Sequence, residues 1–191
     1  MTARGQSTRQ ALLRAALELF SERGFYGTSV PGIAERAGTG AATLYRHFES
    51  KEALAEALYL AAHEEFVASV WHDFPPEGPV RRAFGELWGR LTALAKQQPR
   101  LIVFLEMHYH AAYLASDVIR SSEARSLERL VALIDEGQRQ GVIRRDPPQV
   151  LATFVGAAFF GLVKACLQGG KLVNAAALER GEILVWDALR A

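Results

Sequence analysis

The sequence contains a single cysteine, Cys166, among 191 residues. No disulfide can form within the chain, and such sparing use of cysteine is typical of a reducing compartment. An apolar leader is also missing, because Met1–Gln10 has no hydrophobic run of the kind that a signal peptide carries. The most apolar stretch, Leu151–Leu167, is short for a membrane span and contains Lys164. We therefore expect a soluble, cytoplasmic protein without a membrane partner.

Strand-like alternation is scarce, and tracts of low complexity and repeats of fixed period are missing. Half of the residues are hydrophobic, enough to bury a core, and they recur at helical spacing almost throughout. An excess of one charge is also lacking, because the net charge is +1, which excludes a polybasic chain. The charge is uneven, however: residues 1–51 hold seven Lys and Arg against four Asp and Glu. The pattern predicts an all-α protein with a basic N-terminal end.

Helix starts and stops divide the chain into about nine helices. Ser29 and Ser50 are good N-caps, Gly24 and Gly38 are stops, and the proline-rich segment 75–79 is the clearest break. The helices expected lie at about 8–23, 29–38, 40–47, 50–71, 80–98, 101–113, 116–140, 146–167 and 174–189.

A small residue and a glycine indicate a sharp turn between two short helices near the N-terminus. Ala34 is small enough to let the helices pack closely, and Gly38 can adopt the positive φ that the turn requires. Ile33 and Leu44 would share a core with Phe20 of the preceding helix. The spacing predicts a helix-turn-helix unit whose second helix enters the major groove of DNA, and an ordinary helical hairpin is the alternative.

Polar residues on the second helix favour DNA binding over the ordinary hairpin. Thr43, Tyr45 and His47 would lie on the outer face of a helix too short to need them for stability. Lys51 lies in the first turn of the next helix, where the helix dipole disfavours a cation. A phosphate there would bind both the helix N-terminus and the ammonium group, which would remove the conflict.

Three runs of residues form one specific pattern. They are ALELFSERGFYGTS at 16–29, IAERAG at 33–38, and TLYRHF at 43–48 followed by SKE at 50–52. Together they resemble the N-terminal domain of the TetR family of bacterial transcriptional regulators over about residues 8–58. The resemblance implies a DNA-binding domain at 1–54 and a ligand-binding and dimerisation domain at 55–191. It also implies a ligand-responsive regulator, most often a repressor, that binds operator DNA as a homodimer and is released by a small apolar or aromatic effector.

The resemblance also assigns DNA-contacting positions in this chain. Phosphate contacts fall on Thr28, Thr39, Tyr45, His47 and Lys51, and base contacts fall on Gly40, Ala41 and Thr43. Two positions depart from the family pattern. Gly32 replaces an acidic residue, so the capping box is absent, and Gly40 replaces a hydroxyl residue. Because the helix start lacks the side chains that make bidentate base contacts, no operator sequence follows.

Two arginines lie in the polar leader that is expected before the first helix. Arg4 and Arg9 could reach a flanking groove of DNA as an arm, and a solvated tail is the alternative.

The helix near residues 150–169 is apolar around almost its whole circumference, so it must be covered on all sides. One face carries a row of small residues at four-residue spacing: Thr153, Ala157, Gly161, Ala165 and Gly169. A bulky row lies beside it: Leu151, Val155, Phe159, Val163 and Leu167. With Ile183, Leu184 and Trp186 of the final helix, this helix would form half of an intersubunit four-helix bundle, which also resembles the family's usual dimer. The alternative is the central helix of a monomeric core.

A mixture of aromatic and polar side chains in the middle of the chain suggests a small-molecule pocket. The predicted lining residues are His63, Phe66, Trp71, Phe104, His108, Tyr109, His110 and Tyr113.

Enzymatic function is the rival interpretation, and the residues argue against it. Glu106, His108 and His110 lie close in sequence, but histidines at i and i+2 point to different helix faces, which is poor geometry for one metal ion. Neither H-E-x-x-H nor the E-x-x-H of di-iron bundles occurs, and no strand precedes the glycines at 38–40. We expect no enzyme, no metal and no cofactor. An interaction module of the same fold that has lost DNA binding is the remaining alternative.

Overall fold

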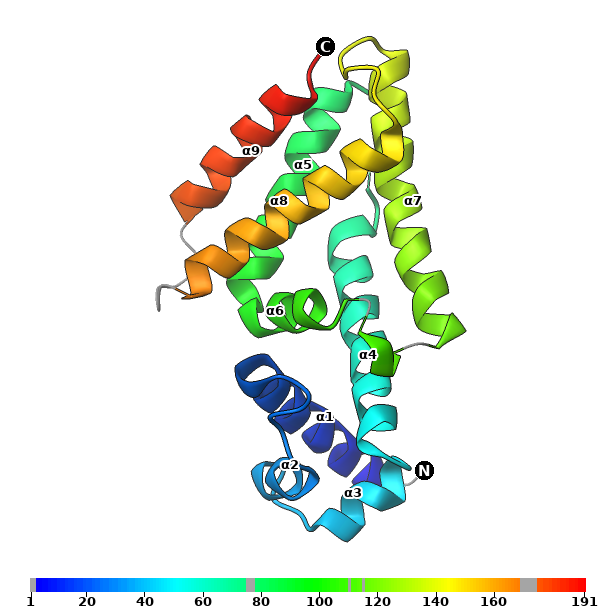
Figure 1. The fold of residues 1–191 in the computed structure, drawn as a ribbon, viewed down its shortest axis with the longest axis vertical. Helices are drawn as coiled ribbons and strands as arrows, with labels where there is room; N and C mark the ends of the chain where they lie inside the picture. The colour runs from blue at the N-terminus through cyan, green and yellow to red at the C-terminus, as the bar shows by residue number, and fades with distance from the viewer. Residues whose placement is uncertain (1–2, 75–77, 110, 115, 169–174) are drawn as a thin grey trace.

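The computed structural model describes residues 3–74, 78–109, 111–114, 116–168 and 175–191, and these residues are mostly helical (Figure 1). An isolated antiparallel bridge between Ile143 and Arg190 is the only β-pairing among them. The all-α prediction is confirmed. The elements are α1 (Ala3–Arg23), α2 (Val30–Arg36), α3 (Ala41–His47), α4 (Lys51–Trp71), α5 (Val80–Gln97), α6 (Pro99–His108), a 3₁₀ turn (Ala112–Leu114), α7 (Asp117–Arg139), α8 (Pro148–Gln168) and α9 (Ala175–Leu189).

Local residues determine several helix ends, as the sequence predicts. The hydroxyl oxygens of Ser29, Ser50 and Ser116 each accept a hydrogen bond from a backbone N–H in the first turn of the helix that follows. Gly38 follows the C-cap of α2 and has a φ of 69°, a positive angle that glycine adopts readily. The expected helix at 101–113 is shorter, because α6 ends at His108 and a separate 3₁₀ turn follows.

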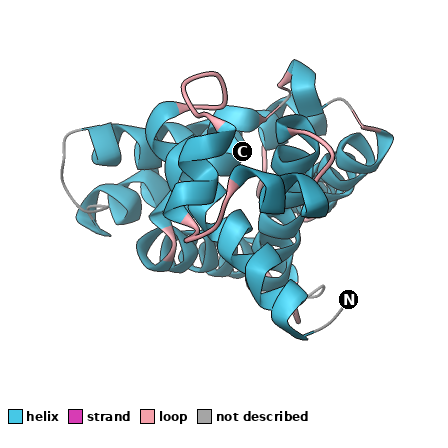
Figure 2. Cartoon of the chain, turned by 90° about the horizontal axis from the view of Figure 1, so that it is seen from below, coloured by secondary structure: helices cyan, strands magenta, loops and turns pink. Residues whose placement is uncertain are grey.

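The molecule is elongated, with a small head at one end and a larger body (Figure 1). The head comprises α1, α2 and α3 (residues 3–50), and the body comprises residues 51–191. Helix α4 begins at the head and runs into the body, where α8 packs against both α7 and α9 (Figure 1). Seen from below, the described chain is helices joined by short loops (Figure 2).

One hydrophobic core continues from the head into the body. Helix α1 packs against α6, where the buried rings of Phe20 and Phe104 are stacked with centroids 6.2 Å apart. At the other end, Gly181 lets α9 approach α8 closely, since a Cβ atom there would lie 2.3 Å from Cδ1 of Leu162. The head is therefore packed on the body through α6 as well as joined to it through α4.

Candidate DNA-binding head and effector region

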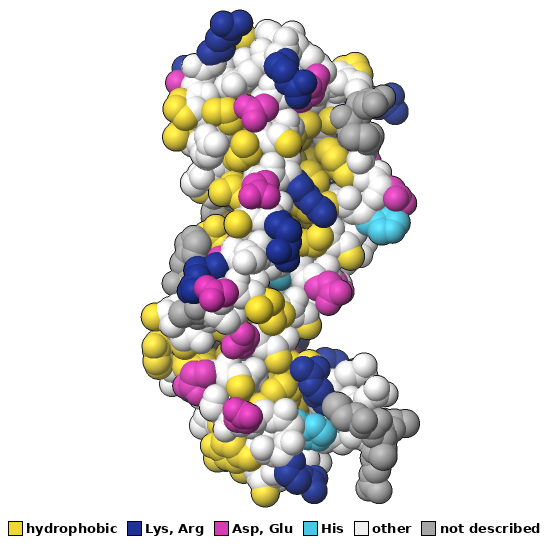
Figure 3. Space-filling model, turned by 90° about the vertical axis from the view of Figure 1, so that its right-hand side faces the viewer, with side chains coloured by type: hydrophobic (Ala, Val, Ile, Leu, Met, Phe, Trp, Pro, Cys, Tyr) yellow, Lys and Arg dark blue, Asp and Glu magenta, His cyan; other side chains and the backbone are white. Residues whose placement is uncertain are grey.

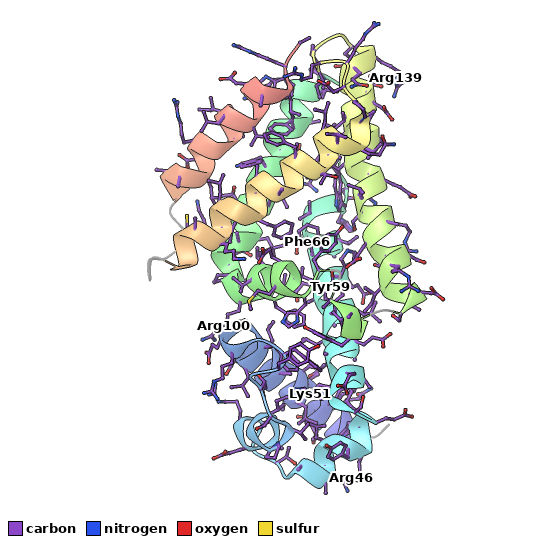
Figure 4. All side chains as sticks on the ribbon, in the orientation of Figure 1. Arg46, Lys51, Tyr59, Phe66, Arg100 and Arg139 are labelled. Atoms are coloured by element: carbon purple, nitrogen blue, oxygen red, sulfur yellow. The ribbon has the colours of Figure 1, made fainter. Side chains whose placement is uncertain are left out.

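Helix α3 lies at the end of the head, farthest from the body (Figure 1). Leu44 is fully buried and points into the head, whereas Ala42, Tyr45 and Arg46 are exposed. Arg46 is labelled at the tip of the molecule in Figure 4. Figure 3 shows basic side chains and a histidine on one face of the head. The outer face of α3 is thus uncovered by the described residues.

The turn between α2 and α3 has the geometry expected of a helix-turn-helix unit. Ala34 is 1% exposed, and its carbonyl oxygen accepts a hydrogen bond of 2.8 Å from the N–H of Thr39. Ile33 and Leu44 are fully buried with Phe20 in one core. Thr39, Thr43 and His47 are half-buried, and Gly40 and Ala41 are at or next to the start of α3. The residues proposed to approach bases therefore lie together at one helix start.

Lys51 does not have the environment that the sequence argument assumed. Its ammonium group donates hydrogen bonds to the carbonyl oxygens of Phe25 (2.9 Å) and Thr28 (3.0 Å) and lies 4.0 Å from the centroid of the Phe25 ring. Figure 4 shows Lys51 between α4 and the rest of the head. The inference that this cation requires a phosphate was wrong, because backbone carbonyls and an aromatic ring already stabilise it.

Thr28 is also directed inward. Its side chain is 4% exposed, and its hydroxyl lies 2.8 Å from the carbonyl oxygen of Gly24 and 3.2 Å from that of Leu19. Its own backbone N–H donates to the carbonyl oxygen of Phe25. These bonds use the hydroxyl and the N–H of Thr28 to hold the loop after α1, so in this structure neither group is free to contact a phosphate.

Arginines of the head differ from expectation in two ways. Arg9 belongs to α1, and its guanidinium lies 5.1 Å from the centroid of the Phe48 ring, so it is not part of an extended arm. The side chain of Arg4 lies outside the described residues. Arg46 was not among the predicted DNA-contacting residues, but it is exposed on α3 and donates a hydrogen bond of 3.3 Å to the hydroxyl of Thr43. The sequence indicates this position, because Arg46 is a cation three residues after Thr43 and therefore lies on the same face of the helix.

The predicted effector residues lie along α4, α6 and the turn after it, where several of them pack in or against the hydrophobic core. His63, on α4, is 7% exposed, and its ring nitrogens lie 2.9 Å and 3.2 Å from the hydroxyls of Ser122 and Ser126 on α7. One turn earlier, the hydroxyl of buried Tyr59 donates a hydrogen bond of 2.5 Å to Glu123. Burial lowers the pKa of His63 and raises that of Tyr59. These groups form a closed polar contact between α4 and α7.

Phe104 and His108 instead belong to the junction between head and body. The His108 ring is 2% exposed, lies 4.4 Å from the Phe104 ring, and is hydrogen-bonded through Nδ1 to the hydroxyl of Tyr113. Tyr113 stacks on Phe25 of the head with ring centroids 3.8 Å apart. Tyr109 is half exposed. Phe104, His108 and Tyr113 thus pack against α1 and the loop that follows it.

Phe66 and Trp71 separate along α4, and His110 lies outside the described residues. Phe66 packs against Phe160 of α8 at 6.5 Å between ring centroids. Trp71 contributes to a pocket of about 400 Å³, the Trp71 pocket, between the end of α4, the start of α5 and α7. The pocket is lined by Trp71, Phe74, Gly78, Val80, Ala83, Arg129, Ala132, Leu133, Glu136 and Arg139. A second, open groove of about 810 Å³ lies between α5 and α9 and includes Trp88 and Thr92.

Helices α8 and α9 both expose apolar side chains. The bulky row of α8 is buried from Leu151 to Val163, but the small residues Thr153, Ala157, Gly161 and Ala165 are exposed. Phe154 of α8 is 45% exposed, and Ile183 and Leu184 of α9 are 44% and 57% exposed. Trp186 differs, because its ring packs within the chain on Phe84 and Arg81.

The segment Pro148–Cys166 of α8 is long enough and apolar enough to span a membrane, judged by length and composition alone. Within the chain, 28% of this segment is buried. Among the described residues, no group of three or more potential metal ligands is brought together.

Two family models together match residues 12–191 of the chain. One, described as bacterial regulatory proteins of the tetR family, matches residues 12–58, and the other, a tetracycline-repressor-like C-terminal domain, matches residues 59–191. The chain belongs to the TetR family. The two matches meet within α4, the helix shared by head and body.

Curated TetR relatives include regulators and repressors. UidR of Escherichia coli K12, an HTH-type transcriptional regulator, is 43% identical over 68 residues, which cover 36% of this chain and 35% of UidR. The chain thus matches about a third of the length of that relative. DhaR of Mycobacterium sp. GP1, an HTH-type transcriptional repressor, is 30% identical over 165 residues, which cover 81% of this chain and 80% of DhaR. The family is one of regulators, which confirms the prediction that the chain is not an enzyme.

Solved TetR-family structures share the whole fold. A regulator from Marinobacter aquaeolei VT8 is 29% identical, with a TM-score of 0.81 over 100% of this chain and 99% of that one. AibR, solved in complex with isovaleryl coenzyme A and operator DNA, is 22% identical with a TM-score of 0.77 over 95% of this chain and 97% of AibR, a likeness of fold alone.

We expect acid to destabilise this TetR-family chain, because His108 is buried at the junction between the head and the body. Burial lowers the pKa of His108 to about 4 from its usual value of 6.5. The unfolded chain therefore binds more protons than the folded chain between these two values, and the free energy of unfolding falls as the pH falls through that window. Between pH 7.5 and pH 5, His108 alone should lower the free energy of unfolding by about 2 kcal/mol.

Urea denaturation of the wild type and of His108→Phe at both pH values measures this contribution. The variant should lose about 2 kcal/mol less than the wild type on acidification. His63, whose pKa is also lowered by burial, is present in both proteins, so the comparison isolates His108. The same pH dependence in both proteins would show that His108 is not held neutral.

Proposed function

We propose that the protein is a transcriptional repressor that binds operator DNA as a homodimer and releases it when a small effector binds to the body. The observation that carries the proposal is the exposed outer face of α3, where the side chains of Tyr45 and Arg46 are exposed. Figure 4 shows Arg46 at the tip of the head. A short helix presented in this way has the docking geometry of a helix-turn-helix recognition helix. The repressor name of DhaR and the operator complex of AibR support the same function.

The proposed DNA surface consists of the head residues that remain available after Thr28 and Lys51 are excluded. They are Thr39, Gly40, Ala41, Thr43, Tyr45, Arg46 and His47. Arg46, Tyr45 and His47 would contact phosphates, whereas the small residues at the start of α3 would approach bases. With small residues there, sequence is read through thymine methyl groups and DNA shape.

The exposed apolar face of α8 and α9 supports the homodimer. Phe154 and Leu184 are large apolar side chains at the surface, and the exposed small row with Gly161 would let two helices approach closely. A second copy of this face, related by a twofold axis, would bury it and form a four-helix bundle. Two recognition helices about 34–36 Å apart would then meet one face of DNA.

Genomic footprinting with the purified protein would identify the operator, and fluorescence anisotropy would then measure its affinity. We expect the Tyr45→Ala, Arg46→Ala double variant to bind the operator at least about tenfold more weakly than the wild type. Each substitution removes a phosphate contact from both heads of the dimer. Glu49→Ala, also exposed but beyond α3, is the matched control and should retain or slightly improve binding. Recovery of no enriched DNA fragment would contradict DNA reading and favour an interaction module.

A further inference from the structure

The Trp71 pocket combines an aromatic surface with a cation that has no acidic partner among the described interactions. The guanidinium of Arg129 lies 6.0 Å from the centroid of the Trp71 ring, and its side chain is exposed. The other arginine of the pocket, Arg139, is paired with Glu136 at 2.6 Å. Resting on the proposed function, we propose that the effector is a small aromatic carboxylate that binds in this pocket with its carboxylate on Arg129.

The described lining of the pocket holds two arginines, Arg129 and Arg139, and one carboxylate, Glu136, so its charge favours an anion. A guanidinium offers parallel N–H donors that match the two oxygens of a carboxylate, and such charge-assisted bonds are stronger than neutral ones. The Arg129 guanidinium lies over the ring of Trp71, so the N–H groups at the edge of the guanidinium can donate to a ligand. A neutral ligand would gain no such charge-assisted bond from Arg129.

The walls of the pocket select an aromatic body. Trp71 and Phe74 meet edge to face, with ring centroids 5.1 Å apart and planes at 70°. Val80, Ala83 and Leu133 supply the remaining apolar surface. The guanidinium of Arg90 lies 5.5 Å from the centroid of the Phe74 ring, so a planar ligand would meet the aromatic surface that remains. About 400 Å³ accommodates one or two fused rings.

The position of the pocket on α4 explains how such a ligand would act on DNA binding. Trp71 is the last residue of α4, and Lys51, which is bonded to the loop of the head, is the first. The helix has 21 residues, about 30 Å, between these ends. At the Trp71 end, Arg90 of α5 donates hydrogen bonds to the carbonyl oxygens of Val70 and His72. A ligand that favours one placement of this end would favour one placement of the head.

Isothermal titration calorimetry of the full-length protein tests the site directly. The probes are 2-naphthoate and its neutral counterpart, 2-naphthamide. We expect 2-naphthoate to bind the wild type, and the Arg129→Gln variant or the amide probe to weaken binding about tenfold or more. Arg125→Gln, an exposed arginine one turn away on α7, is the matched control and should bind the acid within about twofold of the wild type.

A second pair of variants tests the location without altering charge. Ala132 is an exposed wall residue of the pocket on α7, so Ala132→Leu should fill the site and abolish binding of 2-naphthoate. Ala124→Leu makes the same change at an exposed position of α7 outside the pocket and should leave binding unchanged. No heat of binding with the wild type, or equal affinity of the wild type and Arg129→Gln for 2-naphthoate, would overturn the proposal.

The link to regulation is tested on the operator. Saturating 2-naphthoate should weaken operator binding by the wild type at least tenfold and leave Arg129→Gln and Ala132→Leu bound. If 2-naphthoate binds but operator affinity is unchanged, the effector assignment is overturned. Failure of the ligand-free protein to bind any DNA would contradict the proposed function instead, while the calorimetry would still decide whether the pocket binds an aromatic acid.

Discussion

Replacing Gly161 with glutamate is expected to convert the protein into a monomer and to lower operator affinity about 10²- to 10⁴-fold. Gly161 is exposed at the centre of the small row of α8, and a Cβ atom there would meet no other atom within 4 Å. The substitution therefore leaves the protomer unstrained and improves helix propensity. In the proposed dimer, two carboxylates would be placed in an apolar interface at the same point, where burying an unpaired charge is strongly unfavourable.

A monomer is expected to bind DNA more weakly because it has only one DNA-binding head. Once one head is bound, the dimer presents the other at a high effective concentration, and a monomer lacks this advantage. Sedimentation equilibrium measures the oligomeric state, and fluorescence anisotropy measures operator affinity. Gly89→Glu is the matched control, because Gly89 is an exposed helical glycine of α5 whose Cβ would also meet no atom within 4 Å. A dimeric Gly161→Glu protein would place the interface elsewhere.

Local patterns were sufficient to predict most of the fold. The serine caps at Ser29 and Ser50 and the glycine at 38 act on residues within a few positions along the chain. The two rows of α8 follow from helical periodicity, and the structure buries the bulky row and exposes the small one. These features depend on sequence neighbours, so the sequence alone contains the information needed to recognise them.

The functional side chains were harder to predict, because their partners come from distant parts of the chain. Lys51 bonds to a carbonyl oxygen 26 residues earlier, and no local pattern indicates that contact. The polar contacts of His63 join α4 to α7 across 59 residues. The Trp71 pocket likewise depends on how three helices meet. The mixture of aromatic and polar side chains suggested Trp71 as a pocket residue, but it could not pair Trp71 with Arg129.

The role of Lys51 can be separated from that of a phosphate contact by comparing two substitutions. In Lys51→Met, the carbonyl oxygens of Phe25 and Thr28 lose a charged donor in a half-buried site. We expect the free energy of unfolding to fall by about 2 kcal/mol, because hydrogen bonds to charged groups contribute about 1.5–3 kcal/mol. The dependence of operator affinity on salt concentration should be unchanged, since that dependence counts phosphate contacts.

Arg46→Met should give the opposite result. Arg46 is exposed and bonds only to the hydroxyl of Thr43 among the described interactions, so its loss should change stability by less than about 0.5 kcal/mol. The slope of log affinity against log salt concentration should fall in magnitude by about two, one phosphate for each head of the dimer. Urea denaturation and anisotropy titrations at several salt concentrations measure both quantities. If Lys51→Met changed the salt slope and left stability intact, its ammonium group would turn outward to DNA in the bound state.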